Sequence, residues 1–245
     1  MAIARISSGL NEPREMVFHA SEVESKRGCL QAIGRAVPLI EKQRGWRLIP
    51  EEIAKIAINL DVELSPGLAS RPNLVDATLD FLEFRRYGKD SVMLVAKSMA
   101  KAKQAGFGLS GEYRGYSIVS SEDPEYFDED WYHDSPLPPA VTDRAKLLLK
   151  YPNDLAARLR EERKSGLPTV MFLEQARWIN LAVARDDLVF GIRGASANAT
   201  LGTCSNVRRF MNDPTLGSAA TAEILAIPEF WENRLFSIVD LTEYQ

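Results

Sequence analysis

The sequence predicts an α/β fold: a mostly parallel sheet flanked by helices, three-layer, in a single domain over residues 1–245. Continuous apolar runs, typical of strands buried on both faces, alternate with amphipathic stretches of helical period. The order strand, helix, strand indicates right-handed crossovers and parallel neighbours. With 245 residues, of which 45% are hydrophobic, the chain is long enough for one substantial core. The first expected element is a short strand at residues 2–6.

The first long helix is predicted over residues 21–42. Apolar residues recur there at roughly helical spacing, with charged residues between them. Ser21 followed by Glu24 matches a capping box, which indicates the helix start. Pro38 weakens the helix towards its end because proline removes an amide donor, and Gly45 marks the break that follows.

A strand, a helix and a second strand are expected next. The apolar run at residues 53–61 predicts a buried strand that ends in Asn59 and Asp61. Residues 71–86 follow as a helix, with a proline where the first turn tolerates it. The apolar run at residues 91–96 predicts another strand of the sheet, parallel to the first.

Residues 97–104 hold several lysines among small residues, which fits either a short solvated helix or a phosphate-binding cluster. A further strand is expected at residues 115–120. Residues 122–139, which include His133, are acidic and aromatic with no helical period, so they predict a long loop excursion: a lid, a contact surface or a plain connector. The acids of this loop lack the alternating spacing and central glycine of a calcium loop, so no metal site is predicted.

The carboxy-terminal half continues the alternation of helices and strands. Thr142 is placed to cap a helix that runs to residue 164, where a Gly-Leu-Pro sequence soon ends it. The remaining expected elements are strands at residues 169–173, 179–183 and 235–240, and helices at residues 205–211 and 218–227.

The composition argues against several classes of function. A net charge of -4 gives no general basic field, so neither nucleic acid nor an anionic membrane is expected as a partner. Cys29 and Cys204 are too few for a four-thiolate zinc site or an iron-sulfur cluster within one chain, and we expect both to be buried, reduced thiols. No apolar run approaches ~20 residues and the amino terminus lacks a signal-like core, so a cytoplasmic protein is expected.

Polar residues repeatedly follow the apolar runs, most densely at residues 178–200. Open α/β sheets bind their ligands at the carboxyl ends of the strands, so these residues are expected to converge on one edge and form a site. The candidates are Asn59, Asp61, Arg185, Asp187, Arg193, Asn198 and Asp240.

Each candidate has a chemical role and a structural alternative. Arg185 and Arg193 are suited to hold a carboxylate or phosphate, Asn198 to donate an amide hydrogen bond to an oxyanion, and Asp187 to accept a proton. Asn59, Asp61 and also His133 of the excursion are expected to contact the substrate. The alternative is that the arginines and aspartates form structural ion pairs and that the asparagines cap or turn the chain.

No motif names the reaction. The glycines near residue 194 match neither a dinucleotide-binding fingerprint nor a P-loop, and no Gly-x-Ser-x-Gly or His-Glu-x-x-His sequence is present. With two histidines in the chain, a catalytic triad or a multi-histidine metal site is not expected. Cofactor, substrate identity and oligomeric state are not indicated.

At these residues the chain resembles the bacterial and archaeal family called domain of unknown function 362. That family has a strand ending in lysine, a spacer and asparagine; a central strand ending in lysine, any residue and histidine; and a glycine-containing turn with lysine-asparagine. The corresponding positions here are 57–59, 185–187 and 197–198, with residues 239–240 resembling the strand that follows. The resemblance covers residues 53–240 and implies a site at these strand ends.

The chain departs from the family pattern at the residues that would titrate. Asn59 and Asn198 match it, whereas alanines 57 and 197 stand in place of the family's lysines and Asp187 in place of its histidine. The arginine two residues before Asp187 keeps the positive charge but does not titrate near neutral pH. The family is often associated with iron-sulfur centres, and this chain lacks the cysteines for one, so family activity is not carried over whole.

Two hypotheses follow. In the first, the protein is a small-molecule enzyme that acts on an anionic substrate by acid/base or redox chemistry, with Asp187 as the base, Arg185 and Arg193 as anion-binding residues, and residues 122–139 as a lid. In the second, it is a catalytically degenerate homologue, a protein-binding or regulatory subunit, whose excursion contacts a partner. The aromatic residues suited to that contact are Tyr126, Phe127, Trp131 and Tyr132.

Overall fold

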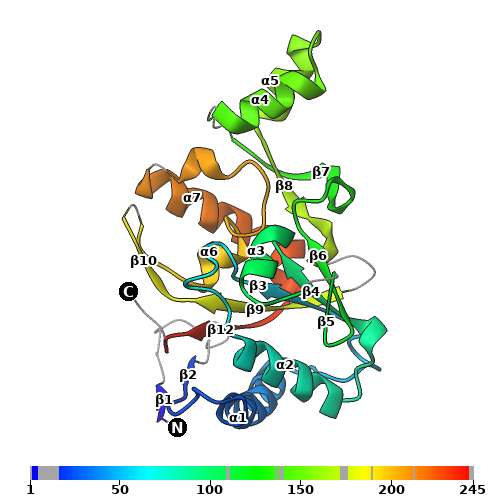
Figure 1. The fold of residues 1–245 in the computed structure, drawn as a ribbon, viewed down its shortest axis with the longest axis vertical. Coiled ribbons are helices and arrows are strands. Elements are labelled where there is room, and N and C mark those ends of the chain that lie inside the picture. Colours follow the sequence, from blue (N-terminus) through cyan, green and yellow to red (C-terminus); the bar gives the residue numbers. More distant parts are fainter. Residues whose placement is uncertain are drawn as a thin grey trace. The chain divides into compact units, whose positions relative to one another are not determined.

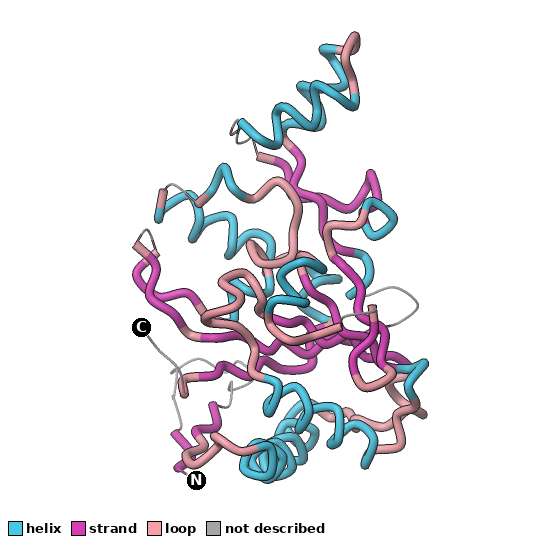
Figure 2. The backbone as a smooth tube through the Cα atoms, in the orientation of Figure 1, coloured by secondary structure: helices cyan, strands magenta, loops and turns pink. Residues whose placement is uncertain are grey.

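The computed structural model describes residues 2–4, 17–108, 111–135, 137, 141–171, 176–188, 190–211 and 213–242. The chain divides into two compact units. Unit 1 comprises Met1–Ala54 and Arg71–Gly88, and unit 2 comprises Lys55–Ser70 and Lys89–Gln245. The main sheet belongs entirely to unit 2 (Figures 1 and 2).

Unit 1 consists of a small two-stranded ribbon and a helix pair. The ribbon pairs β1 (Ala2–Ala4) with β2 (Val17–His19) in antiparallel orientation. Helices α1 (Lys26–Arg44) and α2 (Pro72–Phe84) pack against each other (Figure 1). The remainder of the strand expected at residues 2–6 lies outside the described residues.

The ends of α1 follow from its capping residues, and one of them differs from the prediction. Ser25, not Ser21, caps the helix: its hydroxyl accepts the Gly28 amide at 3.1 Å. At the other end Gly45 adopts a left-handed conformation with φ 73°, which glycine tolerates without steric cost, and its amide donates to Glu41. Pro38 lies inside the helix without ending it.

Unit 2 is built on a six-stranded sheet with the order β12-β9-β3-β4-β6-β5. The four pairings from β12 to β6 are parallel, and β5 adds an antiparallel edge. The α/β fold class and the mostly parallel sheet are therefore confirmed. The strands are β3 (Lys55–Leu60), β4 (Val92–Ala96), β5 (Glu112–Tyr113), β6 (Tyr116–Ser120), β9 (Ala176–Val183) and β12 (Arg234–Asp240).

The central strand β9 is almost wholly buried, as its continuous apolar run predicts. One part of the core forms where Trp178 of β9 and Ala57 of β3 meet Met171, Ala199 and Phe230 from the segments that cover the sheet. These covering segments include the short turn η3 (Thr169–Met171) and the helices α6 (Ala195–Ala199) and α8 (Pro228–Glu232). The core therefore fixes the position of the strands whose ends carry the candidate residues.

The acidic excursion at residues 122–139 is not a plain loop. It contains the turn η2 (Pro124–Tyr126) and the strand β7 (Phe127–Asp134), which pairs antiparallel with β8 (Lys164–Pro168). Aspartate and glutamate disfavour strands in general. Asp128 and Asp130 stay exposed on this two-stranded ribbon, where water solvates their charge.

The helix expected at residues 142–164 is two helices. The chain breaks at a Pro-Asn sequence between α4 (Val141–Lys150) and α5 (Leu155–Glu162), and Asp154 caps α5 by accepting the Ala157 amide at 2.8 Å. Both helices lie between β7 and β8 in the sequence and stand at the end of that ribbon (Figure 1).

Three further elements differ from their predictions. The expected strand at residues 169–173 is the turn η3 as far as Met171, beyond which residues lie outside the described part. The expected helix at residues 205–211 is reduced to the turn η5 (Arg208–Phe210), and helix α7 (Pro214–Leu225) begins before residue 218 because Asp213 caps it. The short helix α3 (Met99–Gln104) follows β4, as one of the two alternatives proposed.

Candidate functional site at the strand ends

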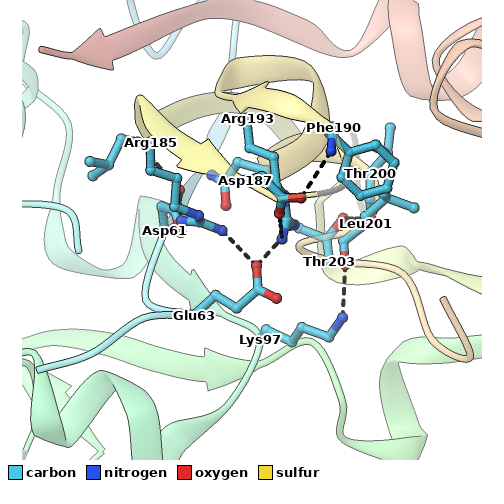
Figure 3. Close-up of polar contacts among 12 residues, drawn as sticks. Asp61, Glu63, Lys97, Arg185, Asp187, Phe190, Arg193, Thr200, Leu201 and Thr203 are labelled. Carbon is cyan, nitrogen blue, oxygen red and sulfur yellow. Dashed lines mark hydrogen bonds and ion pairs between the residues drawn. The ribbon is translucent and has the colours of Figure 1, made fainter. Parts of the chain in front are cut away.

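Charged side chains gather at the carboxyl ends of neighbouring parallel strands, where the sequence places its site (Figure 3). Asp61 and Glu63 follow β3, and Lys97 follows β4. The hairpin formed by β10 (Arg185–Asp187) and β11 (Gly191–Arg193) follows β9. We call Asp61, Glu63, Lys97, Arg185, Asp187 and Arg193 the strand-end cluster.

Arg185 is fully engaged by two carboxylates. Its Nη1 lies 2.8 Å and 3.0 Å from the two carboxylate oxygens of Asp61, and its Nη2 donates to Glu63 Oε2 at 2.6 Å. The side chains of Arg185 and Asp61 are 4% and 2% exposed. Arg185 and Asp61 thus meet each other, as the structural alternative expects.

Arg193 shares Glu63 with Arg185 but is less completely paired. Its Nη2 lies 2.9 Å from the same Oε2 as an ion pair without hydrogen-bond geometry, and its Nη1 lies 3.5 Å from Asp187 Oδ2. Its Nε is buried and has no hydrogen-bond partner among the described residues. Arg193 therefore retains donor capacity inside the cluster.

Asp187 is held in place by the hairpin turn that it begins. Its Oδ1 accepts the Phe190 amide at 3.0 Å, while Oδ2 faces Arg193. The pattern is a common way for aspartate to stabilise a turn.

Lys97 is the titratable amine of the cluster. Its Nζ donates to the Leu201 carbonyl at 2.8 Å, on the far side of the site from the hairpin (Figure 3). Burial lowers the pKa of the Lys97 amine; the charges of Glu63 and Glu122 act in the opposite direction. The signal that distinguishes Lys97 from the other lysines of residues 97–104 is its position directly after an apolar run.

The two predicted asparagines meet at a third that sequence reasoning missed. Asn180, in the middle of β9, uses its Oδ1 to accept from Asn59 at 3.0 Å and from Asn198 at 2.8 Å. Its own amide donates to the Ala195 carbonyl at 2.8 Å at the start of α6. All three asparagines are buried, so this network fastens α6 to β3 and β9. The missed signal is an asparagine inside a run that is otherwise apolar.

The remaining candidates lie elsewhere in unit 2. His133 belongs to β7, where its Nε2 is 2.6 Å from Glu223 of α7 and its ring packs edge-on against Phe210. Asp240 ends β12 and accepts from the amide and hydroxyl of Thr242. The structure thus brings together Asp61, Arg185, Asp187 and Arg193, joins Asn59 to Asn198, and does not place His133 with either group.

Among the residues that the structure describes, two surface hollows stand out, and the strand-end cluster lines neither of them. One, of about 500 Å³, lies along α7 and α8 and includes Trp231 and Leu225. The other, of about 360 Å³, lies between α1 and α2 in unit 1. Glu63 is the most exposed carboxylate of the cluster, with a side chain that is 31% exposed.

In the part of the chain that the structure describes, no group of three or more histidine, cysteine, aspartate or glutamate side chains is arranged to hold a metal ion. Over the same residues, none of the helices combines the length and the apolar character that crossing a bilayer requires.

Comparisons of the chain with protein-family models, with curated proteins and with solved structures gave no match. The resemblance to the domain of unknown function 362 family stays a prediction.

Proposed function

We propose that the protein is an enzyme that binds a small anionic molecule, a carboxylate or a phosphate, at the strand-end cluster and moves a proton on it. The observation that carries the proposal is the Lys97 amine, whose pKa is lowered by burial in the same cluster as Arg193, a buried guanidinium with an unpartnered Nε. Perturbed titratable groups gather preferentially at functional sites.

Glu63 supports the anion-binding part of the proposal. Its Oε2 contacts both Arg185 and Arg193, and this is the position that an incoming carboxylate or phosphate oxygen would take. Because Glu63 is more exposed than either arginine, its side chain is able to move outward into water without breaking the core. A bound anion would then replace an internal carboxylate and keep the arginine charges compensated.

Lys97 supports the acid/base part. A lowered pKa increases the fraction of neutral amine near neutral pH, and the neutral amine is the form that accepts a proton. In this proposal Lys97 is the base in place of Asp187, because Asp187 is already committed to the Phe190 amide and to Arg193. Arg193 orients the anionic end of the substrate, and Arg185 holds the cluster together.

Calorimetric titration with inorganic phosphate and with succinate tests the proposal. We expect Lys97→Met and Arg193→Gln each to weaken binding by about tenfold or more, since each removes a hydrogen-bonding nitrogen group from the cluster. Glu63→Gln is expected to act in the opposite direction and tighten binding, because it removes the competing carboxylate. Enzymatic turnover of a carboxylate or a phosphate substrate should be lost in the Lys97→Met variant.

Lys101→Met is the matched control, because Lys101 also donates from Nζ to a backbone carbonyl, that of Ser65 at 3.0 Å, but does not belong to the cluster. Its binding constants should equal those of the unmodified chain. If neither anion binds, or if Lys97→Met and Lys101→Met behave alike, the proposal is wrong.

Protein binding is a second candidate, favoured by the exposed acids on and beside β7. In that case the charges of the strand-end cluster have only a structural role. Substitutions of the exposed acids on and beside β7 that leave the fold intact would then change partner binding without changing anion binding.

A further inference from the structure

The two helices inserted between β7 and β8 expose apolar side chains. We call residues 144–162, from α4 to α5, the arm. Leu149 is 82% exposed and Leu155 60%, and Leu148 and Leu159 are exposed as well. α4 and α5 pack mainly against each other, so these leucines are not used to bury the arm against unit 2. Several exposed leucines on one element mark an interaction surface more often than an inert one.

The root of the arm is built firmly. Arg209 is buried there, and its acceptors among the described residues are uncharged. They are the carbonyls of Ser135, Leu137, Glu162 and Arg163 and the hydroxyl of Ser165. Asn206 adds donations to the carbonyls of Glu162 and Lys164. Breaking these hydrogen bonds would leave a buried guanidinium without acceptors, which costs free energy. The bonds therefore hold the arm in a defined direction, and its leucines are already presented before a partner binds.

The arm and β7 have opposite charge. The arm, residues 144–162, contains five lysines and arginines against three aspartates and glutamates. Residues 122–134 contain seven aspartates and glutamates and no lysine or arginine. The acids at 122, 123, 125, 128 and 130 are exposed, and we call them the acidic strip.

We propose that two copies of this chain associate through these surfaces, with the basic, leucine-bearing arm of one copy on the acidic strip of the other. A two-fold arrangement uses both surfaces of both copies and closes the assembly. The leucines supply the apolar contact, and the opposite charges supply orientation and speed of association. An anionic bilayer is a poorer fit, because the acidic strip and the net charge of -4 repel it.

Sedimentation analysis of the full chain measures the association. We expect a dimer at about 0.05 M salt and a shift towards monomer at about 0.5 M, because salt screens the contact between exposed charges. Leu149→Glu combined with Leu159→Glu should weaken association by about a hundredfold or more, since charge replaces apolar contact at two positions. Leu241→Glu is the control: Leu241 is 60% exposed, like Leu155, but lies after β12.

Charge reversal tests which surfaces meet. Arg144→Glu with Arg160→Glu on the arm, and Asp128→Lys with Asp130→Lys on the strip, should each yield monomers, and mixing the two variants should restore a dimer. Circular dichroism checks that each variant is folded. A monomeric unmodified chain at low salt, a dimer that survives both the leucine and the charge variants, or binding of a monomer to phosphatidylserine vesicles would overturn the proposal.

Discussion

The side chains of the strand-end cluster differ in how firmly their neighbours hold them. Arg185 and Asp61 are buried and satisfy each other, whereas Glu63 reaches the surface and bridges two arginines. Arg193 keeps a buried Nε without a hydrogen-bond partner among the described residues, and Lys97 donates to a backbone carbonyl rather than to a carboxylate of the cluster. The cluster therefore contains a fixed pair and an adjustable part, and the proposed chemistry uses only the adjustable part.

Breaking the fixed pair should destabilise unit 2. Asp61→Asn leaves the buried Arg185 charge poorly compensated, and we expect a loss of about 3 to 5 kcal/mol in the free energy of unfolding. Urea denaturation measures it. The control is Asp134→Asn, because the Asp134–Arg163 pair also uses both carboxylate oxygens but is half exposed, and its loss should cost less than about 1 kcal/mol. Equal effects in the two variants would contradict the assignment of a buried structural pair.

At the scale of elements, one buried side chain, Arg209, contacts every segment at the root of the β7–β8 ribbon and its arm. Arg209 joins the end of β7, the end of α5 and the start of β8 through hydrogen bonds to uncharged oxygens. Burial lowers its pKa to about 10, so it remains charged at neutral pH. The root of the arm is therefore held in part by a buried cation in η5, a segment distant from the arm in the sequence.

Arg209→Met should loosen the root of the arm. It leaves several buried oxygens without donors, and we expect a loss of about 3 kcal/mol or more in unfolding free energy. Amide hydrogen exchange should accelerate in α4, α5 and β8 more than in β9. Arg208→Met, at the neighbouring exposed position of η5, serves as the control. If exchange in the arm is the same in both variants, Arg209 does not hold it.

At the scale of the whole molecule, burial of ionisable groups predicts how stability depends on pH. The pKa of Lys97 is lowered in the folded state, so burial of its charged form costs stability at low pH, and stability rises as pH increases from the folded pKa towards the unfolded value near 10.5. Burial raises the pKa of the Cys204 thiol to about 12. The contribution of this thiol to the free energy of unfolding therefore decreases as pH rises above 9.0, because the thiol then ionises in the unfolded chain but not in the folded one.

The Lys97→Met substitution separates the effect of Lys97 on the pH dependence of stability from the opposing effect of Cys204. The stability of the unmodified chain relative to Lys97→Met should improve as pH rises from neutral towards 10.5, because only the unmodified chain relieves the buried charge by losing a proton. Urea denaturation of both proteins across this interval is the measurement, with Lys101→Met as the reference for an amine outside the cluster. A pH-independent difference between the chain and Lys97→Met would show that the amine is not perturbed.

Local sequence determined the elements with the strongest patterns. The apolar runs of β3, β4, β9 and β12 predicted the strands, and their polar ends predicted the edge at which Asp61, Arg185, Asp187 and Arg193 meet. The break between α4 and α5 was readable from Pro152 and Asn153, although the helical period across them suggested one helix. The apolar pattern of a strand and the apolar period of a helix involve residues close together in the sequence, so both can be recognised without knowledge of the fold.

The tertiary structure decided the pairings. The role of Asn180 depends on Asn59 and Asn198, which lie in other parts of the chain, and the role of Arg209 depends on a ribbon root assembled from β7, α5 and β8. Within the acidic run, residues 127–134 form the strand β7 because β8 supplies backbone hydrogen-bond partners, and side-chain propensity does not include that energy. Sequence by itself established where polar groups follow buried strands; only the three-dimensional contacts determined which of them are neutralised by each other and which remain able to bind.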